Sequence, residues 1–157
     1  MNCPILFLDI DGVLNSRAWW DSKRAGGIVL VDKPADKFDP AAVARLNRIV
    51  LSVRCRVVLS SSWRHDAPLL NIENWLRSVG FVGALDDKTP WSSTPYERHA
   101  EIEAWLANQG LDPAHPHVAL DDEPGPLGKV RWVVTRYAVG LTAEDAERAI
   151  ALLRGLP

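Results

Sequence analysis

Four short apolar runs alternate with amphipathic segments along this chain, and that alternation constrains the fold more than any other feature. The runs cover residues 5–10, 56–59, 117–120 and 130–135. Each is bounded by polar or turn residues and mostly lacks the alternation of a half-exposed strand, which is typical of parallel strands buried on both faces. The four runs therefore predict the strands of a mainly parallel sheet.

The intervening segments have helical periodicity. They cover residues 39–53, 67–80, 95–110 and 142–155. We expect Asp39 and Thr142 to cap the first and the last helix, and Gly80 and Gly110 to end the two between them. Strands that alternate with helices predict an α/β fold, a three-layer α/β/α sandwich around a mainly parallel, Rossmann-like sheet.

Residues 12–38 do not fit this alternation. They contain a Gly26-Gly27 turn between two stretches that could form short strands or a hairpin. The segment is too short for a separate cap domain, so we expect a small flap beside the end of the first strand. A chain of 157 residues is then expected to form a single domain, residues 1–157.

The composition is that of an ordinary globular protein. A net charge of −2 gives no overall basic excess that would indicate nucleic-acid binding, although a local basic patch is compatible with it. The sequence has no signal-peptide layout and no stretch long enough for a membrane span, so we expect a cytoplasmic protein without a membrane partner. The oligomeric state is open, and a monomer is compatible with the sequence.

Three of the predicted strands end in polar side chains. The ends carry Asp9 and Asp11, then Ser60, Ser61 and Ser62, then Asp121, Asp122 and Glu123. Because ligands bind at the carboxyl ends of the strands in such sheets, we expect these groups to converge at one edge. Several carboxylates with little compensating charge predict a site for a hard cation, and oxygen ligands favour Mg²⁺.

Two carboxylates near one cation also suit phosphoryl transfer. One carboxylate can attack phosphorus to form an aspartyl-phosphate, and the second can protonate the leaving oxygen and then deprotonate water. A cation screens the repulsion, while a hydroxyl group and a cationic side chain hold the phosphoryl oxygens. Taken alone, Asp9 and Asp11 could instead be a solvated strand end, whereas for Asp121 and Asp122 a metal site is favoured over the alternative of a helix cap.

Together these motifs resemble the haloacid dehalogenase (HAD) superfamily. FLDIDGVLN is similar to its first motif, VVLS to its second, and LDD to the paired-acid form of its fourth. Arg98 lies where the superfamily has a basic residue, more often lysine, on the helix before the fourth strand. The resemblance spans about residues 4–142, and LSSSWR, LDDE and VGLT look most like the small capless branch associated with RNA-repair proteins.

That resemblance implies a Mg²⁺-dependent phosphatase that acts through an aspartyl-phosphate. It makes Asp9 the nucleophile and Asp11 the general acid and base. The implied metal ligands are Asp9, Asp122 and the backbone carbonyl of Asp11, supported by Asp121.

Four further side chains are expected at the substrate. Ser60 is expected to hold the phosphoryl group, with Ser61 as the alternative, although the serines could instead cap the next helix. Arg98 is expected to neutralise the phosphoryl group rather than to form a surface ion pair. Arg64 could reach a substrate phosphate or have a structural role.

The resemblance also bears on the substrate, because capless members tend to act on large substrates. A polynucleotide end phosphate or a phosphoprotein is therefore favoured, and a small-molecule phosphatase such as a nucleotidase is an alternative. A non-catalytic module that binds phosphate is a further alternative. Trp19 and Trp20 in the flap could stack on a base or pack the flap onto the domain.

Overall fold

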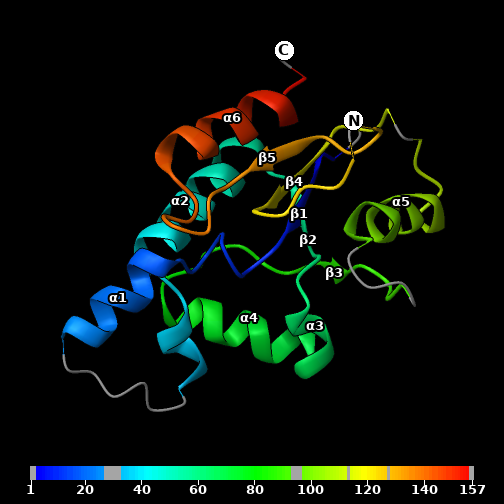
Figure 1. Cartoon of the computed structure of the whole chain (residues 1–157). Coiled ribbons are helices and arrows are strands. Elements are labelled where there is room, and N and C mark those ends of the chain that lie inside the picture. Colours follow the sequence, from blue (N-terminus) through cyan, green and yellow to red (C-terminus); the bar gives the residue numbers. More distant parts are fainter. Residues whose placement is uncertain (1–2, 27–32, 93–96, 113, 127, 156–157) are drawn as a thin grey trace.

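A parallel sheet forms the centre of the protein (Figure 1). The computed structural model describes residues 3–26, 33–92, 97–112, 114–126 and 128–155. The strands are β1 (Ile5–Leu8), β2 (Arg56–Leu59), β3 (Asp87–Lys88), β4 (His117–Asp121) and β5 (Trp132–Val134). They lie in the order β3-β2-β1-β4-β5, and every neighbouring pair is parallel.

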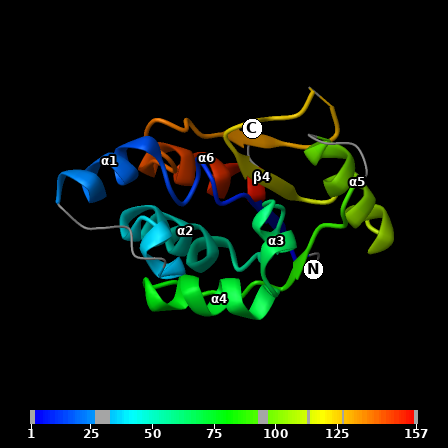
Figure 2. The ribbon, with the colours of Figure 1, turned by 60° about the horizontal axis from the view of Figure 1, so that its bottom comes forward.

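Helices cover both faces of this sheet. They are α1 (Arg17–Ala25), the 3-10 turn η1 (Pro34–Lys37), α2 (Pro40–Val53), α3 (Trp63–Asp66), α4 (Leu69–Ser78), α5 (Arg98–Asn108) and α6 (Ala143–Leu153). Figure 2 shows α5 on the opposite side of the sheet from α2 and α4. The predicted three-layer α/β/α sandwich with a parallel sheet is thus confirmed.

The burial of β1 explains why its sequence lacks polar alternation. Leu6 and Leu8 pack into the core shared with α2, α4 and α6, whereas Ile5 and Phe7 pack against α5. All four side chains are fully buried. A strand with two buried faces must be apolar throughout, and this requirement produces the run seen in the sequence.

The predicted helix caps are also confirmed. The Asp39 side chain accepts a hydrogen bond of 2.8 Å from the Ala41 backbone N–H. Thr142 and Asp145 form a reciprocal capping box at the start of α6. The helix expected over residues 95–110 is α5, although residues 95 and 96 lie outside the described residues.

The structure corrects the prediction for residues 12–38. Arg17–Ala25 form the helix α1, not the expected strand or hairpin arm, and η1 follows at Pro34–Lys37. The Ser16 side chain caps α1 by accepting a hydrogen bond from the Trp19 backbone N–H. Gly27 of the predicted turn and residues 28–32 lie outside the described residues. Within the described ranges, no helix is long and apolar enough to cross a membrane.

Candidate active site

The carboxyl edge of the sheet brings the predicted site residues together. Asp9 follows β1, Ser60 follows β2, and Asp121 is the last residue of β4. The Ser60 N–H donates to the Leu8 carbonyl over 2.9 Å, and the Asp9 N–H donates to the Leu120 carbonyl over 3.0 Å. These bonds continue the sheet and hold the backbone of Asp9 between its two neighbouring strands.

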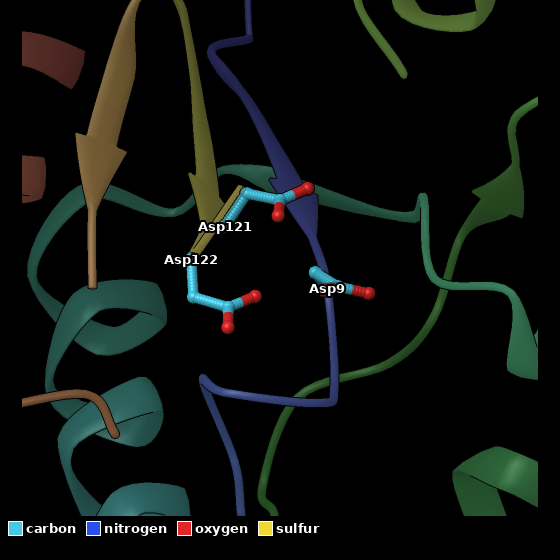
Figure 3. Close-up of side chains that lie close together, drawn as sticks. All are labelled: Asp9, Asp121 and Asp122. Carbon is cyan, nitrogen blue, oxygen red and sulfur yellow. The ribbon is translucent and has the colours of Figure 1, made fainter. Parts of the chain in front are cut away.

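Three carboxylates form an acidic cluster at this edge. One oxygen each from Asp9, Asp121 and Asp122 lies within 4.8 Å of the others (Figure 3). Asp9 and Asp121 are almost fully buried, and Asp121 Oδ2 makes no hydrogen bond within the described part of the chain. A buried set of oxygen donors with an unsatisfied member fits a hard divalent cation. The cluster brings together the three carboxylates predicted at the metal, Asp9, Asp121 and Asp122. The Asp11 carboxylate lies outside it, and the predicted contribution of Asp11 through its backbone carbonyl stays a prediction.

Gly12 allows Asp122 to approach this cluster. Its φ of +72° is a left-handed conformation that a residue with a side chain rarely adopts. A Cβ at position 12 would overlap the Asp122 carboxyl group and lie 2.7 Å from Asp122 Cβ. The Thr135 hydroxyl donates to the Gly12 carbonyl over 2.7 Å and fixes the turn. The glycine of the first motif is therefore a steric requirement of the acidic cluster.

The cluster raises the pKa values of its own members. Burial, together with the charge of Asp9, raises the pKa of Asp121 to about 7. Burial and the charge of Asp9 also raise the pKa of Asp122. Burial raises the pKa of Asp9 although the Arg98 guanidinium opposes this shift. A cation bound here would favour the ionised carboxylates and so relieve the cost of burying them.

Arg98 lies in direct contact with the acidic cluster. It begins α5, and its Nη1 donates to Asp9 Oδ1 over 3.1 Å and to the Ser60 carbonyl. Its Nε lies 3.6 Å from Asp121 Oδ2. Burial alone would lower the pKa of Arg98, but Asp9 and Asp121 raise it, so the guanidinium stays charged. The expected basic residue therefore lies beside the predicted nucleophile.

Asp11 is held separately from the acidic cluster. It is exposed, and its two carboxylate oxygens accept hydrogen bonds from different side chains. Asn15 Nδ2 donates to Oδ1 over 2.8 Å, and Trp63 Nε1 donates to Oδ2 over 2.9 Å. Sequence reasoning missed both donors. The position of Asn15 in the turn after Asp11 was a usable signal, whereas no local signal indicated Trp63.

The serines after β2 have different environments. The Ser61 hydroxyl is close enough to Asp9 to oppose the rise of the Asp9 pKa, and its oxygen accepts a hydrogen bond of 3.4 Å from the Trp63 backbone N–H. The Ser60 hydroxyl is buried and has no hydrogen-bond partner within the described ranges. Ser62 lines the cleft in front of the cluster and gives α3 no side-chain cap. Of the two candidates, only Ser61 thus has a side-chain contact to Asp9 among the described residues.

Arg64 is buried and fully engaged by the protein. Its guanidinium donates to the carbonyls of Ser60, Ser61, Thr89 and Pro90 over 2.6–3.4 Å. Its Nη2 also forms an ion pair of 2.6 Å with Glu101. These contacts use all five N–H donors of the side chain. In this arrangement Arg64 supports the loop after β2 and has no free donor for a phosphate.

An acidic cleft opens in front of these residues. It has a volume of about 420 Å³. The carboxylates lining it are Asp9, Asp11, Glu97, Glu101, Asp121, Asp122 and Glu123, against the two guanidinium groups of Arg64 and Arg98. Such a cleft repels a phosphate anion until a cation is bound. His65, Trp91 and Tyr137 also line it and were not anticipated from the sequence.

Comparison with known proteins identifies the family. The chain matches the family model described as the HAD domain in Swiss Army Knife RNA repair proteins over residues 5–146. No curated protein and no solved structure matches the chain. The matched range includes the acidic cluster, Arg98 and all five strands of the sheet. The chain therefore belongs to the family of HAD domains of Swiss Army Knife RNA repair proteins.

Proposed function

We propose that this protein is a Mg²⁺-dependent phosphatase that removes terminal phosphates from polynucleotides through an aspartyl-phosphate on Asp9. The observation that carries the proposal is the position of Asp9, which belongs to the acidic cluster and also contacts the Arg98 guanidinium. A nucleophilic carboxylate needs a cation on the incoming phosphoryl group and a positive charge on its oxygens. A cation held by the acidic cluster would meet the first requirement, and the Arg98 guanidinium would meet the second.

Asp9, Asp121 and Asp122 are the side chains that would hold Mg²⁺. Their donor set consists of oxygens only, and a cation would neutralise the excess of carboxylates that lines the cleft. When bound, Mg²⁺ would supply positive charge to the phosphoryl oxygens and screen them from Asp9.

The chain's own residues then divide the chemistry between them. An Asp9 oxygen forms a bond to phosphorus while the bond from phosphorus to the leaving oxygen breaks, and Asp11 gives that oxygen a proton. A water molecule next attacks phosphorus while Asp11 takes a proton from it. The bond between phosphorus and the Asp9 oxygen then breaks, so that phosphate leaves and the Asp9 carboxylate is restored. Arg98 and Ser61 are proposed to hold the phosphoryl oxygens, since Arg98 donates to Asp9 and the Ser61 hydroxyl lies close to it.

Phosphate release from a panel of substrates tests the activity. The panel contains an aryl phosphate, mononucleotides, 3′- and 5′-phosphorylated oligonucleotides and a phosphopeptide. We expect Mg²⁺-dependent release, with one oligonucleotide end preferred, and a loss of roughly 100-fold or more in Asp9→Asn and Asp11→Asn. Asp66→Asn is the matched control, because Asp66 is an exposed aspartate outside the cleft.

Two results would contradict the proposal. Absence of turnover in a folded protein that binds Mg²⁺ would favour a phosphate-binding module. Equal turnover of mononucleotides and oligonucleotides would favour a small-molecule phosphatase.

The same assay distinguishes the roles of Ser60 and Ser61. We expect Ser61→Ala to slow turnover more than Ser60→Ala. The opposite order would assign the phosphoryl contact to Ser60, as the motif alone suggests.

A further inference from the structure

A second groove adjoins the acidic cleft. It has a volume of about 380 Å³ and is lined by Arg17, Trp20, Asp21, Arg24 and Tyr137. Tyr137 also lines the acidic cleft, so the two depressions share this side chain as a common wall. We call this second depression the α1 groove. A substrate longer than one nucleotide could therefore extend from the cleft past Tyr137 into the α1 groove.

The α1 groove is built from one helix face and one turn. Trp20 and Asp21 follow Arg17 by three and four positions, and Arg24 follows them by four and three, so the four residues share one face of α1. The backbone of the turn at Tyr137 is fixed against α1, because the Arg17 N–H donates to the Tyr137 carbonyl over 2.9 Å. The helix and the turn that carry the basic and aromatic side chains are thus held beside each other.

The two tryptophans of α1 have different environments. Trp19 packs the helix onto the protein, since its Nε1 donates to the Asp36 carbonyl over 3.2 Å and Lys23 lies over its ring. Trp20 instead lines the α1 groove and is half-exposed. Tyr137 is 46% exposed. Trp20 and Tyr137 therefore offer two accessible aromatic rings.

The charge of the α1 groove contrasts with that of the acidic cleft. Arg17 and Arg24 give it two guanidinium groups, opposed by the single carboxylate of Asp21. Arg24 lies 3.7 Å from Asp21, but both side chains are highly exposed, so this pair is weak and leaves the guanidinium available. The excess of positive charge lets the α1 groove attract an anion directly, whereas the acidic cleft must bind a cation before it can accept an anion.

We propose that the α1 groove binds the nucleotides next to the terminal phosphate of a single-stranded nucleic acid. Guanidinium groups bind the phosphodiester backbone, and exposed aromatic rings stack on bases of any sequence. A phosphopeptide would supply neither a regular row of phosphates nor a series of flat bases. This inference rests on the proposed function, because it places the terminal phosphate at Asp9.

Binding is measured first, so that the test does not depend on turnover. The probe is a fluorescein-labelled single strand of about ten nucleotides with a terminal phosphate, titrated with the Asp9→Asn protein and followed by anisotropy. We expect Trp20→Ala and the double variant Arg17→Gln/Arg24→Gln each to weaken binding about 10-fold. The double variant should also reduce the slope of log affinity against log salt by about 1.4.

Matched controls separate the α1 groove from general effects of charge and stability. Arg48→Gln/Arg77→Gln removes the same charge from exposed arginines outside both depressions and should bind the probe normally. Trp20→Phe keeps an aromatic ring and should retain most of the affinity. Unchanged affinity in both groove variants, or stronger binding of a phosphopeptide than of the oligonucleotide, would overturn the inference.

Kinetics then distinguish this inference from the proposed function. In the protein with Asp9 intact, the groove variants should raise KM for the oligonucleotide about 10-fold and leave the aryl phosphate unaffected. An equal loss with the aryl phosphate would assign these residues to the catalytic cleft and overturn the inference. Groove-dependent binding without hydrolysis of any substrate would refute the phosphatase and leave the binding site standing.

Discussion

Replacing Gly12 with alanine tests how the acidic cluster is assembled. The substitution adds one methyl group at a residue with a φ of +72°, where it would overlap the Asp122 carboxyl group. Gly110 is a matched control, since its φ is +68° and a Cβ there would meet nothing within 4 Å. Both variants carry the same backbone strain, and only Gly12→Ala also displaces a proposed metal ligand.

The two costs can be estimated separately. A left-handed conformation costs a residue with a Cβ about 1–2 kcal/mol, which lowers the melting temperature of either variant by roughly 2–8 °C. Mg²⁺ at about 100 times its dissociation constant stabilises a protein by about 2.7 kcal/mol. A 100-fold loss of affinity on displacement of Asp122 would leave only about 0.4 kcal/mol of that stabilisation.

Thermal unfolding with and without Mg²⁺ measures both quantities. We expect Mg²⁺ to raise the melting temperature of the wild type and of Gly110→Ala by roughly 5–11 °C, and that of Gly12→Ala by about 1–2 °C. If Gly12→Ala melts at too low a temperature for this comparison, isothermal titration calorimetry measures its Mg²⁺ affinity at a temperature where the variant is still folded. A full Mg²⁺ response in Gly12→Ala would refute the inference that Gly12 makes room for a metal-ligating Asp122.

Three further changes probe other parts of the site. Glu101→Gln leaves the buried Arg64 guanidinium unpaired and should lower the free energy of unfolding by about 3–5 kcal/mol in urea titrations, and an unchanged value would contradict the buried pair. Because the pKa of Asp121 is raised from 3.8 to about 7, the metal-free protein should lose stability as pH rises through that window. Stabilisation by Mg²⁺ should instead grow between about pH 6 and about pH 8, and Asp121→Asn should flatten both trends in thermal melts. Trp63→Phe removes one hydrogen bond to Asp11 and should lower kcat about 10-fold in phosphate-release assays while the Mg²⁺-induced shift in melting temperature stays unchanged.

Much of the fold could be predicted because its signals are local. The apolar runs follow from burial on both faces, and the caps at Asp39 and Thr142 depend on neighbours within three residues. The strand β3 (Asp87–Lys88) has only two residues, both polar, so no hydrophobic pattern marks it. Helix α1 has a local cap at Ser16, but its first N–H groups also donate to the carbonyls of Tyr137 and Ala138, more than a hundred residues away, and no local pattern indicates these contacts.

The candidate site was predictable where it depends on strand ends. Topology alone brings Asp9 and Asp121 to one edge, and a resemblance in the motifs points to Arg98. The position of Arg64 could not be predicted, because four of its acceptors are backbone carbonyls that no residue type encodes. The Trp63 contact to Asp11 joins residues 52 positions apart and leaves no trace in local spacing.

The end of β1 explains how two aspartates two residues apart acquire different properties. The strand stops at Leu8, and the turn at Gly12 carries the chain away from the sheet. Asp9 therefore stays buried in the acidic cluster, while Asp11 is exposed and is held by uncharged donors. In the proposed mechanism, Asp9 as metal ligand and nucleophile benefits from exclusion of water, whereas Asp11 as acid and base must exchange protons with it. The break in the strand separates these two requirements within three residues.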